Sequence, residues 1–200
     1  MSMVTAVAAA FLLGSVPFGW IVGRLVAGVD VRRLGSGNIG ATNVWRTVGP
    51  VAGLATGLLD TLKGWGGVAA ATALAPGAPS GLRLAAGLAA IAGHNWTPWL
   101  GFHGGRGVLT SGGVFLYLAW APVLVSFAVF GVVFAATRYV SIGSMTAAVA
   151  LPVAMVLLPG AWHDPVLIAF GFVTASLIVL RHVPNIRRLR AGTEHRFGRR

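Results

Sequence analysis

The stretch from Gly35 to Arg46 holds the residue types in this chain that are best suited to chemistry. Its sequence, GSGNIGATNVWR, alternates glycines with hydroxyl and amide side chains and closes on an arginine. Glycine turns expose backbone N–H groups, and such donors, together with hydroxyls and a guanidinium, are suited to holding an oxyanion such as phosphate. We therefore predict a phosphate-binding loop, with candidate residues Ser36, Gly37, Asn38, Thr42, Asn43 and Arg46.

Two further polar segments interrupt the apolar sequence, and each combines glycines with potential donors. GHNWTPWLGFHGGRGVLTSGG spans residues 93–113, and RHVPNIRRLRAGTEHRFG spans residues 181–198. Singly they are weak signals, because glycine-rich turns often serve helix packing and a lone histidine is more often an interfacial or capping residue. The candidates that they add are His94, Gly104, Gly105, Arg106, Gly107, His182 and Asn185, with Ser141 from the nearby stretch 138–144.

The residue types argue against several kinds of catalysis. The chain has no cysteine and only 4 acidic residues, which disfavours thiol chemistry, paired carboxylates and a carboxylate metal site. It has no G-x-S-x-G motif, and His94 and His103 have no convincing third partner for zinc. We therefore expect no metal and no cofactor. Positioning and electrostatic stabilisation remain, and they suit the transfer of an already activated group between two anionic molecules.

The composition is that of a membrane protein. The chain is 56% hydrophobic and only 10% charged, whereas a soluble domain carries about 25% charged residues. The formal charge is +11, and its arginines lie between apolar segments and in the tail, which fits the positive-inside rule and anionic lipid better than nucleic acid. No basic segment precedes the first apolar run, so we expect a retained transmembrane helix rather than a signal peptide.

The number of membrane passes depends on the long apolar segment 108–137, which contains Pro122. As one span it gives six passes and leaves the arginine-rich tail outside. Split near Pro122, it forms two helices shorter than the roughly 20 residues of a straight span and puts every basic segment on one side. We therefore predict an all-α integral membrane protein with about seven transmembrane helices, some short or re-entrant, with the N-terminus outside and the C-terminus cytoplasmic. The apolar segments are 3–22 with Pro17 in its second half, 51–75, 82 to about 94, 108–137, 139–158 and 166–180.

This topology predicts a single membrane-embedded domain over residues 1–200, with a basic cytoplasmic tail at 181–200 and the three polar segments meeting on the cytoplasmic face. Within the second span, Asp60 and Lys63 are three residues apart and so lie on one helix face. They are either an intramembrane ion pair that serves structure or functional groups, since ionisable residues at this depth are often functional. The sequence favours neither interpretation.

The three polar segments together resemble the motifs of a known family. GSGNIGATNVWRTVGPVAGLATGLLDTLKG, GHNWTPWLGFHGGRGV and RHVPNIRRLRAGTEHRFG, with LLGSVPFG at 12–19, are similar to the bacterial acyl-phosphate:glycerol-3-phosphate acyltransferases (PlsY). The resemblance covers nearly the whole chain. It implies a seven-helix enzyme of the bacterial inner membrane with its active site facing the cytoplasm. Such an enzyme transfers a fatty acyl group from acyl-phosphate to the sn-1 hydroxyl of glycerol 3-phosphate, giving lysophosphatidic acid and phosphate in phospholipid biosynthesis.

The resemblance also implies roles for individual residues. Where the family commonly reads FKGGKG, this chain has His103 and Arg106 in place of the two lysines, so its substrate affinity is expected to differ. The other matches are the essential Ser36 and Arg46, the phosphate-binding Gly104, Gly105 and Gly107 preceded by His94, the third-motif His182 and Asn185, and the structural Glu194.

The expected partners are acyl-phosphate, glycerol 3-phosphate and membrane lipid, and no nucleic acid. Docking of the soluble phosphate acyltransferase that makes acyl-phosphate stays open. Two other classes of protein fit less well. A transporter should show inverted repeats and polar groups on both sides of the membrane, and the sequence has no internal repeat. A lipid-binding scaffold needs only the basic tail and interfacial tryptophans, which leaves the long polar loops unexplained.

Overall fold

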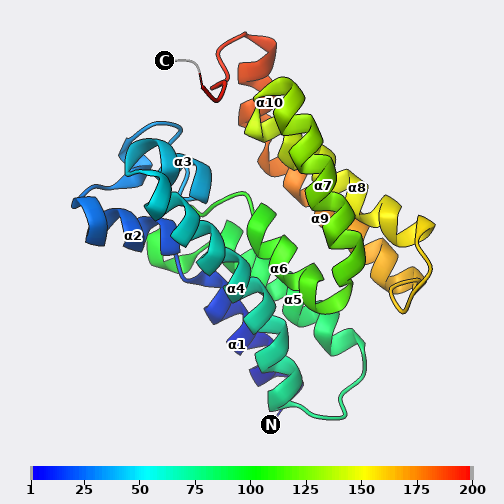
Figure 1. Ribbon diagram of the computed structural model, residues 1–200. Coiled ribbons are helices and arrows are strands. Elements are labelled where there is room, and N and C mark those ends of the chain that lie inside the picture. The colour runs from blue at the N-terminus through cyan, green and yellow to red at the C-terminus, as the bar shows by residue number, and fades with distance from the viewer. Residues whose placement is uncertain (1, 199–200) are drawn as a thin grey trace. The chain divides into compact units, whose positions relative to one another are not determined.

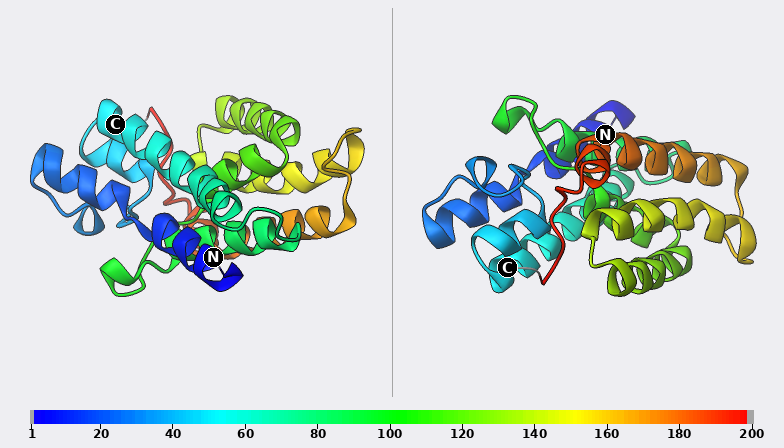
Figure 2. Two further views of the ribbon diagram at one scale, coloured as in Figure 1. Left: turned by 90° about the horizontal axis from the view of Figure 1, so that it is seen from below. Right: turned by 90° about the horizontal axis from the view of Figure 1, so that it is seen from above.

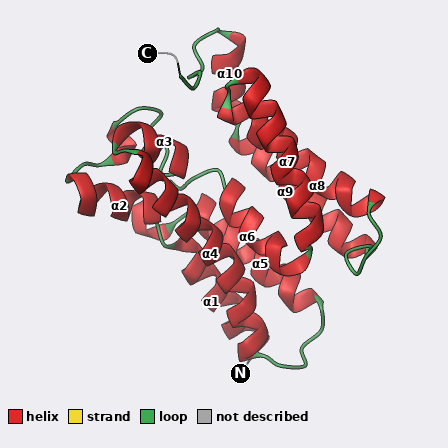
Figure 3. Cartoon of the chain, viewed as in Figure 1, coloured by secondary structure: helices red, strands yellow, loops and turns green. Residues whose placement is uncertain are grey.

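The computed structural model describes residues 2–198, which fold into ten α-helices and two short 3₁₀ helices with no β-strand among them (Figures 1 and 3). The all-α prediction is confirmed for these residues. The chain divides into two compact units, residues 1–117 and 118–200. Met1, and Arg199 and Arg200 of the predicted tail, lie outside the described residues.

The first span is a helix broken in two. α1 (Met3–Ser15) ends before Val16 and Pro17, and α2 (Phe18–Ala27) begins directly after them. Pro17 has no N–H for a helical carbonyl and disfavours the helical conformation of the residue before it, so the break falls there. The predicted end at residue 22 is wrong, since the helix runs past Arg24 until Gly28 takes a left-handed φ of 67°.

The rest of the first unit is arranged around the long helix α4 (Pro50–Leu74). α1 and α5 (Gly81–Asn95) pack against each other and against α4, and α3 (Ala41–Thr47) packs on α4 as well (Figure 1). α4 and α5 lie where the apolar segments 51–75 and 82 to about 94 were predicted, and their crossing of the membrane stays a prediction. The 3₁₀ helices η1 (Val31–Arg33) and η2 (Pro98–Leu100) and the short helix α6 (Val108–Leu118) complete the unit.

Glycines allow the helices of this unit to approach at backbone distance. A Cβ atom on Gly64 of α4 would overlap the carbonyl group of Thr110 in α6, and one on Gly113 of α6 would overlap the carbonyl group of Thr61 in α4. Glycines of α1 and α5 make a similar reciprocal contact. Small residues at helix crossings are typical of membrane proteins, where helix association depends on close packing.

The predicted split of segment 108–137 is confirmed, but its position differs. The break lies at Ala119, between α6 and α7 (Trp120–Thr137). A proline ring clashes with the carbonyl four residues earlier, which here belongs to Leu118, the last residue of α6. Pro122 itself fits in the first turn of α7, where its missing N–H costs no hydrogen bond. The two helices therefore have 11 and 18 residues in place of nearly equal halves.

In the second unit, α8 (Val140–Leu157) packs against both α7 and α9 (Pro165–Arg181), and the three helices lie side by side in both views of Figure 2. α10 (Val183–Arg190) follows α9 at a bend of 52°. The tail, predicted only as basic, thus contains a helix, and Pro184 lies in its first turn, where proline is well tolerated.

Three helical segments are long and apolar enough to cross a membrane: Met3–Ala27, Trp120–Thr137 and Val140–Leu157. A fourth is added if α9 and α10 count as one bent span. α4 has 25 residues but carries Asp60 and Lys63 in its middle, and α6 is short. The count of seven passes therefore stays a prediction.

Candidate active site

The loop of the first motif is organised by Asn43, which is only 2% exposed. Its Oδ1 accepts a hydrogen bond from the backbone N–H of Ser36 at 2.9 Å, and its Nδ2 donates to the carbonyls of Val31 at 2.9 Å and Leu34 at 3.1 Å. Gly35 lies so close to Asn43 that a Cβ atom would overlap the amide, and its φ is 57°. The Asn43 side chain thus shapes the loop. Its contact with the substrate stays a prediction.

The other candidates of this loop are partly exposed around the start of α3. Asn38 accepts from the backbone N–H of Gly40 at 2.7 Å, which turns the chain into the helix. Ser36 precedes that turn, Thr42 lies in the first turn of α3, and Arg46 lies in its last turn. Hydroxyl, amide and guanidinium groups are therefore held within one short loop and helix, and their binding of phosphate stays a prediction.

The turn before the loop is fixed by Asp30, a residue that the sequence reading did not select. Its Oδ1 accepts from the backbone N–H of Arg32 at 3.0 Å, and its Oδ2 pairs with the Arg32 guanidinium at 2.7 Å. This guanidinium holds the pKa of the Asp30 carboxyl well below its usual range. Asp30 is therefore charged across the physiological range and keeps the turn closed.

The second motif is a glycine loop folded back onto the end of α5. The backbone N–H of Gly104 donates to the carbonyl of Asn95 at 3.2 Å, and that of Gly105 donates to the carbonyl of His94 at 3.0 Å. A Cβ atom on Gly105 would overlap Nε2 of the His94 ring, and one on Gly107, whose φ is 77°, would lie 2.8 Å from Oδ1 of Asn95. The glycines are needed here because the loop lies directly on His94 and Asn95.

The two positions that depart from the family pattern are both on this loop. His103 is exposed, and its Nδ1 lies 2.6 Å from the carbonyl oxygen of Gly101. Arg106 is half-buried between the two glycines that contact the end of α5. A guanidinium offers a planar fork that matches two phosphate oxygens, which a lysine ammonium does not.

His94 also connects the loop to the buried charges of α4. Its Nδ1 lies 3.7 Å from Oδ1 of Asp60, and the same oxygen pairs with Nζ of Lys63 at 2.8 Å. The three residues are 4%, 3% and 6% exposed, respectively. The sequence left the role of the acid and the lysine open, and their contact with His94 joins them to the second motif.

α4 brings the first and second motifs together within the first unit. A Cβ atom on Gly57 would lie 3.5 Å from Cβ of Ala41, at the start of α3, and 3.2 Å from Leu109, just after the glycine loop. One helical turn further along α4, Asp60 faces His94. Leu100 of the second motif belongs to the same buried cluster as Val44 of the first. The two segments, 35–46 and 93–113, thus share one helix as their support.

The third motif, in the second unit, is organised by Glu194. Its Oε1 accepts from Nδ2 of Asn185 at 2.6 Å, and its Oε2 accepts from Nε of Arg188 at 2.7 Å. Burial raises the pKa of the Glu194 carboxyl, but the hydrogen bonds from Asn185 and Arg188 outweigh burial, and the pKa falls below its ordinary value. Glu194 therefore connects the tail to α10 through Asn185 and Arg188, and Ser141 of α8 lies near its carboxyl group.

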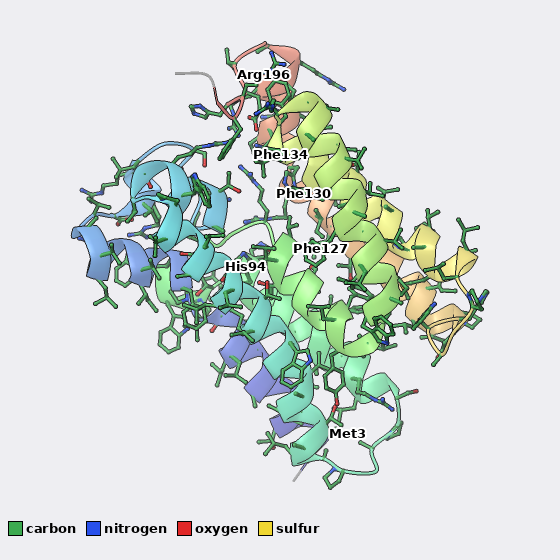
Figure 4. All side chains as sticks on the ribbon, in the orientation of Figure 1. Met3, His94, Phe127, Phe130, Phe134 and Arg196 are labelled. Carbon is green, nitrogen blue, oxygen red and sulfur yellow. The ribbon has the colours of Figure 1, made fainter. Side chains whose placement is uncertain are left out.

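The candidate histidine of this motif is buried. His182 is 1% exposed, and its Nδ1 lies 2.8 Å from the carbonyl oxygen of Ile178. Nδ1 therefore carries the proton in the neutral ring, and Nε2 is the acceptor. The tail then returns to the turn between α7 and α8, where the N–H of Phe197 donates to the carbonyl of Arg138 and its ring meets the ring of Phe134 edge-on. Figure 4 labels Phe134, which lies near the end of α7. Oδ1 of Asn185 has no hydrogen-bond partner among the described residues.

Sequence reasoning missed Asp30, Asn95 and Arg188, all of which hold a motif in shape. Asn95 is 0% exposed and lies against Gly107. A signal for Arg188 was present, because Glu194 is the only acid in the basic segment 181–198 and needs a partner. For Asp30 and Asn95 the contacts are specific to the folded loops.

Comparison with known proteins identifies the family. A family model described as glycerol-3-phosphate acyltransferase matches residues 4–192. The chain belongs to this family. Among its relatives, the glycerol-3-phosphate acyltransferase of Geobacter sulfurreducens is 46% identical over 190 residues, which are 95% of each chain. That of an Anaeromyxobacter species is 45% identical over 96% of this chain and 94% of the relative.

Two crystal structures of PlsY, an integral membrane glycerol 3-phosphate acyltransferase, are also similar. The glycerol 3-phosphate form has a TM-score of 0.91 and 38% identity, over 99% of this chain and 96% of that chain. The lysophosphatidic acid form has a TM-score of 0.88 with the same identity and coverage. The predicted family is thus confirmed, and the chain is an all-helical integral membrane glycerol-3-phosphate acyltransferase of lipid biosynthesis.

Proposed function

We propose that the chain transfers a fatty acyl group from acyl-phosphate to the sn-1 hydroxyl of glycerol 3-phosphate, at the cytoplasmic face of a bacterial inner membrane. The products are lysophosphatidic acid and inorganic phosphate. The observation that carries this proposal is that one stretch of α4 supports both the donor-rich loop 35–46 and the glycine loop that lies on His94. A site that positions two anionic substrates needs such a pair of neighbouring anion-binding segments.

The side chains divide into phosphate-binding and orienting groups. Ser36, Arg46, Arg106 and Asn185 hold the phosphate of glycerol 3-phosphate, while the donor phosphate lies at the glycine loop and its acyl chain among the helices. The N–H groups of Gly104 and Gly105 donate to carbonyls of α5, so Arg106 supplies the cation of this loop. That Ser36, Arg46 and Arg106 form one site with His182 and Asn185 is part of the proposal.

The chemical step needs little beyond positioning, because acyl-phosphate is already activated. The sn-1 oxygen forms a bond to the acyl carbon, the bond from that carbon to the phosphate oxygen breaks, and the departing phosphate takes the hydroxyl proton. His94 or His182 orients the carbonyl or the hydroxyl. No acyl-enzyme forms on this route, so covalently acylated protein after incubation with the donor alone would contradict it.

The activity is tested on purified protein in detergent or lipid. Palmitoyl phosphate with glycerol 3-phosphate should release phosphate and give lysophosphatidic acid, whereas palmitoyl-coenzyme A should not replace the donor. Transfer from the coenzyme A thioester but not from the acyl-phosphate would overturn the proposed donor.

Replacing Ser36 or Arg46 with alanine should abolish transfer or raise the KM for glycerol 3-phosphate at least about tenfold, because each variant loses a hydrogen bond to a charged group. The measurement is kcat and KM for both substrates. Arg33→Ala is the matched control, since Arg33 is exposed on η1 just before the loop. Wild-type kinetics in both site variants would remove this loop from the active site.

A further inference from the structure

The first unit buries a charged pair that the transfer step does not use. Asp60 and Lys63 lie on α4 and are 3% and 6% exposed. Removing two charges from water is costly, and a buried ion pair can often be replaced by apolar residues without loss of stability. A charged pair retained at such a position therefore calls for a specific use of its charge.

Lys63 connects the pair to the break in the first span. Its Nζ donates to the carbonyl of Val16 at 2.7 Å and pairs with Oδ1 of Asp60 at 2.8 Å. The Val16 carbonyl lies where Pro17 interrupts the helix, and it accepts from the N–H of Phe18 at 3.0 Å as well. The ammonium also lies 5.6 Å from the centre of the Phe18 ring. The position of Lys63 is thus fixed by α2 as well as by α4.

Asp60 connects the same pair to the second motif. Its Oδ1, already held by Lys63, lies 3.7 Å from Nδ1 of His94, which is longer than a hydrogen bond but within ion-pair range. The opposite edge of the ring, at Nε2, lies against Gly105. One edge of the imidazole therefore faces a carboxylate, and the other faces the glycine loop.

We propose that Asp60 is a positioning residue that sets the orientation and tautomer of His94, and that Lys63 holds Asp60 in place from the break between α1 and α2. This inference rests on the proposed role of His94. With its proton on Nδ1, facing Asp60, the ring directs its Nε2 to the glycine loop as an acceptor in the neutral form. Asp60 and Lys63 do not touch the substrates.

A double variant, Asp60→Leu with Lys63→Met, separates positioning from stability. Either single change leaves one buried charge without its main partner, so each should lower the melting temperature, whereas the double change removes both charges and should recover much of it. If the pair served structure alone, activity would return together with stability. We expect instead a double variant that is folded but has a kcat about 10- to 100-fold below wild type, with the KM for glycerol 3-phosphate changed little. A double variant with wild-type kcat overturns the proposal.

A second measurement needs no change at Asp60. In protein labelled with ¹⁵N-histidine, the His94 signals are those missing from the spectrum of His94→Gln. We expect Nδ1 of His94 to carry a proton at neutral pH, and an unprotonated Nδ1 overturns the proposal even if the double variant does not fold.

His94→Gln distinguishes a failure of the proposed role of His94 from a failure of the proposed role of Asp60 and Lys63. Wild-type kcat in His94→Gln would overturn the proposed role of His94 in transfer, and with it this inference. Loss of activity in His94→Gln together with wild-type kcat in the double variant overturns only the role of Asp60 and Lys63.

Discussion

At the residue scale, the position of His94 explains why residues 104 and 105 of the second motif are glycines. The pattern GGRG reads as a phosphate loop, yet the N–H groups of Gly104 and Gly105 donate to carbonyls at the end of α5. Space is the stronger requirement, because a side chain at either position would overlap His94. The loop can therefore hold the imidazole from one side while presenting the Arg106 cation to a phosphate.

Gly105→Ala tests this explanation. The added Cβ atom would overlap Nε2 of His94, so the ring has to move, and a misplacement of about 1 Å in a reacting group can lower the rate about 100-fold. We expect a loss of that order in kcat, with the melting temperature affected much less. Gly81→Ala, whose Cβ atom meets nothing within 4 Å, is the control and should keep wild-type kcat. Unchanged kcat in Gly105→Ala would show that His94 needs no fixed position.

At the element scale, α4 is the support of the first unit. Through Gly57, one face of this helix contacts α3 and Leu109, which lies just after the glycine loop, and Asp60 and Lys63 follow about one and two turns further along. Gly64 then allows α6 to cross at backbone distance. A helix with so many glycines has poor intrinsic stability, and close packing with its neighbours compensates for it.

Gly64→Ala and Gly66→Ala form a matched pair on α4. A Cβ atom at residue 64 would overlap the carbonyl of Thr110, so we expect destabilisation of about 1–3 kcal/mol from overpacking. At residue 66 nothing lies within 4 Å, and alanine should be neutral or stabilising by about 0.5–1 kcal/mol, because it is the better helix former. Unfolding in detergent, followed by tryptophan fluorescence, measures both variants. Equal stability of the two would contradict the close crossing of α4 and α6.

The tail is a second element with a single organising residue, Glu194, and its pKa predicts a pH dependence. Because the folded-state pKa is lowered, the carboxylate contributes stability that is fully present above its ordinary pKa of 4.5 and is lost as the pH falls through the folded-state value. Glu194→Gln should therefore be less stable than wild type by a constant amount between pH 6 and 8. That difference should shrink below about pH 4.5.

Thermal unfolding of wild type and Glu194→Gln across this pH range makes the measurement. Arg196→Gln is the control, since Arg196 is an exposed residue of the same tail and has no part in the Glu194 contacts. A stability difference that is unchanged at pH 4 would show that the charge of the Glu194 carboxylate is not the source of this stability.

At the scale of the whole molecule, the predicted number of membrane passes can be tested by labelling. With seven passes, the turn between α4 and α5 lies outside and the tail lies in the cytoplasm, whereas six passes place both outside. The chain has no cysteine, so single cysteines can be introduced without further changes. Ser80→Cys and Ala191→Cys put one thiol at each of these exposed places.

An impermeant maleimide added to intact spheroplasts should label Ser80→Cys but not Ala191→Cys. After the membrane is permeabilised, both thiols should react, which serves as the control for accessibility. Labelling of both in intact spheroplasts would favour six passes and would place the tail of this enzyme on the outer side.

The sequence by itself determined the properties that depend on overall composition or on residues close together in the chain. Membrane class followed from composition, and most helices lie where apolar runs and prolines placed them. The errors lie at three places. The first span continues past Arg24 to Gly28, the break at Ala119 precedes the proline that causes it, and α10 is a polar helix that gives no apolar signal. Motif order and spacing also sufficed for the family. Only the tertiary structure placed Asp60 beside His94, and Asn43 inside its own loop, because these contacts join segments whose separation in space local sequence does not encode.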